Sequence, residues 1–183
     1  MVALNEVLGI STVGIYDHQP QNAVKYAKEM SDQFGFKVEH MESAMQAVQD
    51  ADVIITATPS TSPIVLNEWI KEGVHINAIG ADAPDKQELD SAIVARAKVV
   101  VDSMSQCAER SEIQTAVRLG LLKRDAVYAE LSDIVLERKA RRVNAQELTL
   151  FDSTGLAIQD ITTGYAVYEL AKRQGIGIRV SIE

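Results

Sequence analysis

The chain has few of the features that mark secreted, membrane-spanning or metal-binding proteins. Its 183 residues include one cysteine, Cys107, so no internal disulfide can form. The longest apolar stretches are far too short to cross a bilayer, and the first residues lack the basic segment and apolar run of a signal peptide. The three histidines show no metal-ligand spacing, so we expect no metal site. These absences favour a reducing, cytoplasmic setting.

Positive charge is also scarce. The chain has 18 Lys and Arg residues against 26 Asp and Glu residues, which gives a formal net charge of −8 at pH 7. An acidic surface disfavours nucleic acids and anionic membranes as partners. The single basic run, Arg138 to Arg142, could contact a phosphate, but a solvated loop is the preferred interpretation.

Short apolar runs alternate with segments of helical periodicity along the whole chain. Apolar residues make up 46% of it, and no Pro/Gly/Ser-rich linker divides it, so we expect one domain with its own core. Strands that alternate with helices predict crossover connections and a parallel sheet. The expected strands cover residues 12–16, 36–40, 53–55, 74–79, 99–101 and 148–151, with a tail strand at 176–182. The expected helices cover residues 3–8, 20–34, 43–51, 67–72, 87–97, 111–119, 129–137 and 155–173.

The acidic residue Asp17 ends the first expected strand. In dinucleotide-binding folds a carboxylate here accepts hydrogen bonds from both ribose hydroxyls and repels a 2′-phosphate, which selects NAD over NADP. An Asp can equally start a turn and cap the helix that begins near Pro20. The Gly-x-Gly-x-x-Gly loop expected about 20 residues earlier is absent, because the chain begins inside the helix that such a loop would open.

Three further segments follow expected strands, where ligands of open α/β sheets bind. The hydroxyl-rich run from Thr56 to Ser60 could meet a ribose or a nicotinamide, although such a run is more often a turn. Asp82 lies where a proton could be moved beside a ligand, with helix capping as the alternative. The run from Asp152 to Gly155 opens the last helix, whose free amide groups could hold an anion or an amide, or could simply be capped by Ser or Thr.

Three long motifs together carry a resemblance to a known family. They are Gly73 to Asp82, Lys86 to Asp90 and Leu148 to Asp160, and they share the family's order and spacing. The chain resembles the ornithine cyclodeaminase, mu-crystallin and archaeal alanine dehydrogenase family. It is most similar to the alanine dehydrogenase branch, which shares Gly80-Ala81-Asp82 and Asp152-Ser153-Thr154-Gly155.

The resemblance implies an α/β fold of the Rossmann type. It would have a mostly parallel sheet with helices on both faces, and would lack the first strand and the Gly-rich loop. Residues 1–183 would form a partial NAD-binding domain, in which residues 155–183 are a long helix and a tail strand that return to an amino-terminal domain.

The resemblance also implies roles for individual residues. Asp17 would bind the adenosine ribose of NAD, and Asp82 would be the catalytic acid/base. Ser153 would contact the nicotinamide, and Thr154 would face the substrate. The other implied cofactor contacts are Thr58, Ile76, Asn77, Ala78, Ile79 and Lys86.

The chemistry implied by the resemblance is hydride transfer from the α-carbon of a small amino acid to NAD, which leaves an imine. Water hydrolyses that imine in an alanine dehydrogenase. In an ornithine cyclodeaminase the side-chain amine attacks it, ammonia leaves, and hydride returns to give proline. Asp82 would move the protons in either reaction.

The chain also departs from the family. The family's amino-terminal domain supplies a catalytic Lys, a carboxylate-binding Arg and the dimer interface, and none of these is present in the sequence. At five matched positions the family usually has Gly, and each change strains its turn by roughly 1 kcal/mol if the position needs a positive φ. These positions hold Asp85, Ser111, Ser132, Glu137 and Arg141.

Two hypotheses of function follow. The first is an NAD-dependent oxidoreductase acting on an amino acid, and the second is a remnant that binds a nucleotide weakly or oligomerises without catalysis. Without a strand between them, residues 12–16 and 53–56 would have open inner edges, which invite pairing with another chain. We therefore expect a homo-oligomer or an amino-terminal partner.

Overall fold

The strands of this computed structural model, which describes residues 2–178 and residue 180, all pair in parallel. The main sheet has the order β3 (Val53–Thr56), β5 (His75–Ala78), β9 (Thr149–Asp152), β7 (Lys98–Val101) and β8 (Ala129–Glu130). Two smaller sheets pair β1 (Thr12–Ile15) with β2 (Lys37–His40) and β4 (Thr61–Val65) with β6 (Gln87–Leu89). The predicted α/β class with a mostly parallel sheet is confirmed.

Helices connect most of the strands, as parallel pairing requires. They are α1 (Val2–Val7), α2 (Pro20–Phe34), α3 (Ala44–Val48), α4 (Ser91–Arg96), α5 (Met104–Arg110), α6 (Glu112–Arg118), α7 (Leu131–Val135) and α8 (Ala157–Gln174), with 3₁₀ turns η1 (Asn67–Trp69) and η2 (Arg124–Ala126). Helix α2 begins at Pro20, which suits a first turn, and ends at Gly35 with φ 72°.

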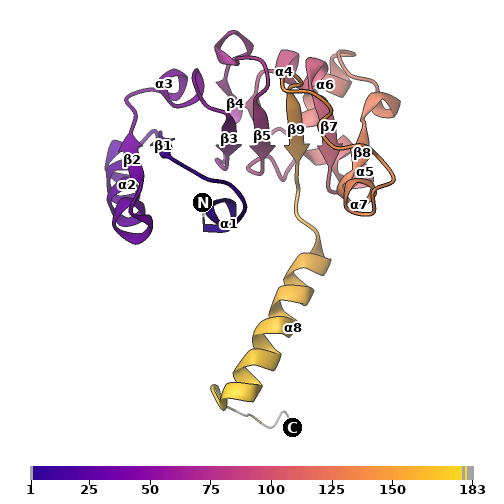
Figure 1. Ribbon diagram of the computed structural model, residues 1–183. Helices are drawn as coiled ribbons and strands as arrows, with labels where there is room; N and C mark the ends of the chain where they lie inside the picture. The colour runs from indigo at the N-terminus through magenta and orange to yellow at the C-terminus, as the bar shows by residue number, and fades with distance from the viewer. Residues whose placement is uncertain (1, 179, 181–183) are drawn as a thin grey trace.

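The last helix, α8, extends away from the sheet, and none of its side chains is buried (Figure 1). Within the described ranges, no helix combines the length and apolar character needed to cross a bilayer.

Alternation along the strands places the core on one face of the main sheet. Ile54, Ile76, Val99 and Leu150 are at most 4% exposed and pack with side chains of α4 and α6. The residues between them on each strand face the opposite side and are half-buried or exposed, as Ile55 is.

Several predicted boundaries are wrong. Residues 87–97 are not one helix but β6 followed by α4, because the backbone N–H groups of Glu88 and Leu89 donate to the distant Glu112 carboxylate. Asp90 then caps α4 by accepting from the N–H of Ala92. The expected helix at 67–72 is only the turn η1, since Ile70 is already extended. The expected helix at 129–137 starts with β8, which pairs with β7.

The carboxyl-terminal tail shows no strand in its described part, residues 176–178 and 180, while Arg179, Ser181 and Ile182 of the predicted strand lie outside the described residues. Strands β1 and β3 each have a partner on one side only, and among the described residues neither pairs with the other. Both therefore present one free edge.

The five positions where the family usually has Gly behave differently from one another. Asp85 and Glu137 have φ of 65° and 57°, the left-handed region in which a side chain is strained. Ser111, Ser132 and Arg141 do not have a positive φ, so the condition for strain is not met at these three positions.

Candidate cofactor and catalytic site

The candidate site lies at the carboxyl-terminal edge of the main sheet. Register pairs Thr56 with Ala78, Ala78 with Asp152, and Asp152 with Val101, so four strands end level with one another. Their arrowheads point to one edge, from which α8 departs (Figure 1). The loops that follow these strands therefore meet at the place where open α/β sheets bind ligands.

A buried carboxylate joins two of these loops. Glu88 is 0% exposed, and its Oε1 and Oε2 accept from the N–H of Thr58 at 2.5 Å and of Gly80 at 3.0 Å. A Cβ on Gly80 would lie 2.4 Å from the carbonyl oxygen of Thr58 and 2.5 Å from the Glu88 carboxyl. Only glycine permits this close approach.

A second buried carboxylate, Asp102, fixes the loop after β9. Its oxygens accept from Ser153 Oγ at 2.8 Å, from the N–H of Thr154 at 2.9 Å and from the N–H of Gly155 at 2.7 Å. Because the Ser153 hydroxyl gives its one proton to Asp102, its oxygen is left as an acceptor.

Two further acids, Glu112 and Asp152, accept hydrogen bonds inside the core next to this edge. Glu112 accepts from the N–H groups of Glu88 at 2.6 Å and Leu89 at 3.0 Å, and burial raises the pKa of its carboxyl to about 8. Asp152 accepts from the Ser111 hydroxyl and from the N–H of Ile113 at 3.1 Å. Burial raises the pKa of Asp152 to about 7.

The predicted acid/base Asp82 is paired with a predicted cofactor contact. The Nζ atom of Lys86 lies 2.5 Å from Asp82 Oδ1, and this hydrogen bond lowers the pKa of the largely exposed Asp82 carboxyl. Gln114 donates from Nε2 to the carbonyl oxygens of Ala83 at 3.4 Å and Lys86 at 3.3 Å, which holds the turn on α6. The arrangement presents an ionised carboxylate that can accept a proton.

Asp17 stands on the separate pair of strands, at the end of β1. Its Oδ1 accepts from the N–H of Gln19 at 2.8 Å and lies 3.3 Å from His18 Nδ1. Its Oδ2 accepts no hydrogen bond from the residues that the structure describes. The carboxylate thus starts a turn before α2 through only one of its two oxygens.

The predicted contacts in β5 differ in exposure. The side chains of Ile76 and Ala78 are buried in the core, and their backbone lies in the ladder between β3 and β9. Asn77 Oδ1 lies 3.3 Å from His75 Nε2, and Ile79 is 48% exposed at the sheet edge.

Sequence reasoning did not find Glu88, Asp102 or Glu112. Asp102 had a usable signal, since it follows the apolar run Val99 to Val101 as Asp17 follows its own strand. Glu88 was hidden within the wrongly predicted helix.

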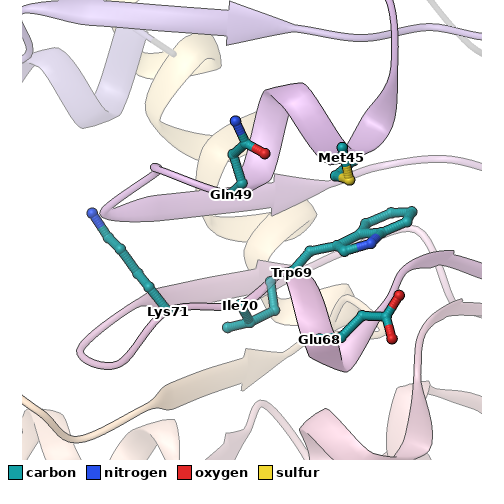
Figure 2. A pocket seen from close by; sticks show the side chains of 6 residues that line it. All are labelled: Met45, Gln49, Glu68, Trp69, Ile70 and Lys71. Atoms are coloured by element: carbon teal, nitrogen blue, oxygen red, sulfur yellow. The ribbon is translucent and has the colours of Figure 1, made fainter.

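A groove of about 360 Å³ lies elsewhere, beside Trp69 and between α3 and η1 (Figure 2). One of its lining residues, Lys71, donates to the carbonyl oxygen of Asp50 and to Asp52, which precede β3. The groove is therefore at the amino-terminal end of β3, away from the loops described above.

The chain belongs to the ornithine cyclodeaminase/mu-crystallin family, whose model matches residues 1–175. It is 40% identical over 181 residues to an alanine dehydrogenase of Archaeoglobus fulgidus, covering 97% of this chain and 54% of that protein. The predicted family resemblance is confirmed.

Solved structures of relatives superpose closely on the chain. An archaeal alanine dehydrogenase dimer with bound NAD matches with a TM-score of 0.93 and 40% identity, over 100% of this chain and 56% of that one. A Thermococcus litoralis Δ¹-pyrroline-2-carboxylate reductase in complex with NADH and L-proline matches with a TM-score of 0.95 and 40% identity, over 98% and 56%. The chain thus spans about half the length of these relatives.

Proposed function

We propose that this chain is the NAD-binding part of an oxidoreductase that acts on the α-amino group of an amino acid through an imine. The observation that carries the proposal is the carboxyl-terminal sheet edge. There, Glu88 and Asp102 fix the loops of Thr58, Gly80 and Ser153, and the ionised Asp82 stands beside them. The alanine dehydrogenase and pyrroline-carboxylate reductase relatives support both the cofactor and the substrate class.

The residues present fit a nicotinamide dinucleotide. Asp17 has a carboxylate oxygen available to a ribose hydroxyl, and the Ser153 oxygen can accept from a carboxamide N–H. The hydroxyl of Thr56, at the end of β3, is buried with no hydrogen-bond partner among the described residues, and Ile79 offers an exposed apolar surface for a ring. Thr58, Asn77 and Lys86, with Ile76 and Ala78 of the same strand β5, complete the proposed contacts.

The reaction needs a proton acceptor close to the cofactor. When bound, NAD would supply the hydride acceptor for the substrate α-carbon. Asp82, kept ionised by Lys86, takes a proton from the substrate amine and returns it in the reverse direction. Thr154, whose position is set by Asp102, faces the substrate.

Reduction of a cyclic imine is a second candidate reaction, favoured by the Thermococcus litoralis relative that holds NADH and L-proline. An ornithine cyclodeaminase would use the same groups in sequence. The products separate an alanine dehydrogenase, which releases ammonia and a 2-oxo acid, from the other two reactions, which both yield proline.

Calorimetric titration of the chain with NAD and NADP tests the proposal. We expect tighter binding of NAD, because Asp17 attracts ribose hydroxyls and repels a 2′-phosphate. Asp17→Ser should reduce the preference about 10-fold, the scale of a hydrogen bond to a charged group. Glu39→Gln, on the neighbouring strand β2, is the matched control and should leave the preference unchanged. Equal or tighter binding of NADP by the wild-type chain would refute the cofactor assignment.

A further inference from the structure

The two oxygens of Glu88 are divided between two loops. Oε1 accepts from Thr58 at 2.5 Å and Oε2 from Gly80 at 3.0 Å, and the side chain is completely buried. Within the described part of the chain, no lysine or arginine forms an ion pair with it. A buried carboxylate without a cation is expensive to remove from water. Packing alone does not explain a carboxylate at this position.

The end of the β3–β5 ladder explains why a carboxylate is needed at position 88. The last ladder bond runs from the N–H of Ile79 to the carbonyl oxygen of Thr56 at 3.0 Å. Beyond it, Thr58 and Gly80 both present N–H donors, which cannot pair with each other. A carboxylate is acceptor-only on both oxygens, so it satisfies two donors at once, whereas a glutamine would turn an NH₂ group towards one of them. Gly80 leaves the room that this bridge requires.

We propose that Glu88 is a positioning residue for the nucleotide. By bridging Thr58 and Gly80 it sets the separation of the loops after β3 and β5, and so presents Thr58 and the turn of Asp82 to one ligand. This inference rests on the proposed function. It predicts that losing the bridge loosens these loops and weakens nucleotide binding, while strand pairing below Thr56 persists.

The test combines amide hydrogen exchange, followed by NMR, with calorimetric titration of NADH. Glu88→Gln should speed exchange of the Thr58 or Gly80 amide, and should weaken NADH binding, each by about 10-fold. Glu88→Asp keeps an acceptor-only carboxylate on a shorter side chain. Its amide exchange and its affinity for NADH should therefore lie between those of wild type and those of Glu88→Gln. Val94→Ala, a cavity in the same core, controls for lost stability and should leave the two amides and the affinity unchanged.

The outcomes separate this inference from the proposed function. Unchanged exchange of both amides in Glu88→Gln, with normal NADH binding by the wild-type chain, would overturn the role of Glu88 alone. An affinity loss of the same size in Val94→Ala would also overturn it. No NADH binding by the wild-type chain, with exchange accelerated as expected, would overturn the proposed function and with it the nucleotide assignment. If Glu88→Gln does not fold, the comparison of Glu88→Asp with wild type decides, since unchanged exchange and affinity there refute the bridge.

Discussion

Stability should fall as the pH rises from about 5 to 8, because two buried acids hold their protons in the folded chain. Burial raises the pKa of Glu112 from 4.5 to about 8 and that of Asp152 from 3.8 to about 7. Below the unfolded pKa both states are protonated, and neither group opposes folding. Between the unfolded and folded values, the unfolded chain has released a proton that the folded chain retains, so stability decreases with pH.

The size of this effect follows from the same values. Each group contributes a slope of about −1.4 kcal/mol per pH unit inside its window. For Glu112, the window from 4.5 to about 8 corresponds to at most roughly 5 kcal/mol, and the loss is complete above pH 8. This is comparable with the whole stability of an ordinary domain, so the chain should be clearly more stable at pH 5 than at pH 8.

Glu112→Gln isolates the contribution of one acid. The amide can accept from only one of the N–H groups of Glu88 and Leu89, so it should lower stability by about 1–3 kcal/mol at pH 5, and this difference from wild type should shrink as the pH rises. It cannot ionise, however, so the slope above pH 5 should become shallower by about 1.4 kcal/mol per pH unit. Urea unfolding at pH 5, 6, 7 and 8, followed by circular dichroism, measures both, with the exposed Glu68→Gln as control. Equal slopes in wild type and Glu112→Gln would refute the reasoning.

Three further outcomes are expected. Glu137→Gly should raise the free energy of unfolding by about 1 kcal/mol, because it relieves a positive φ. Arg141→Gly, at a position without a positive φ, is the control and should not raise it. A lower stability of Glu137→Gly than of wild type would contradict this reasoning. In a chimera that joins this chain to the amino-terminal domain of the Archaeoglobus fulgidus relative, Asp82→Asn should lower kcat by on the order of 10²-fold, with Asp85→Asn as the nearby control. Light scattering should show self-association of the chain, since β1 and β3 present free edges. A monomer at high concentration would refute the role of these edges in self-association.

Local sequence signals predicted six of the nine strands in the described part of the chain and missed β4, β6 and β8. The strands from Val53 and Val99 are continuous apolar runs, and α2 carries its own stop at Gly35, so nearby residues determine these elements. Residues 87–89 have no such pattern. They form a strand because they pair with β4 and because Glu112, 23 or 24 residues away, accepts their N–H groups. Contacts at such separations leave no periodic signal.

The candidate site was predictable to the extent that it follows strand ends. Asp17, Thr58, Asp82 and Ser153 all come just after a strand, and their proposed roles came from the family resemblance. The residues that position them were not predicted, because each acts across the sheet. Glu88 accepts a hydrogen bond from Thr58, which lies 30 residues earlier in the sequence, and Asp102 accepts one from Ser153, which lies 51 residues later.

The supporting residues share one chemistry, and the sheet edge explains why. Where parallel strands end together, the loops beyond them expose backbone N–H groups with no carbonyl opposite, and a carboxylate is the side chain that accepts from two at once. Glu88 and Asp102 accept from loop N–H groups in this way, and the buried Glu112 and Asp152 accept from N–H groups of β6 and α6, so acidic side chains connect β6, α6 and the loops of the site. Burial of Glu112 and Asp152 lowers stability at neutral pH, yet replacing any of the four acids by an apolar residue would leave its N–H partners unsatisfied. Glu112 and Asp152 therefore make the fold pH-sensitive, while Glu88 and Asp102 hold the loops of the site in shape.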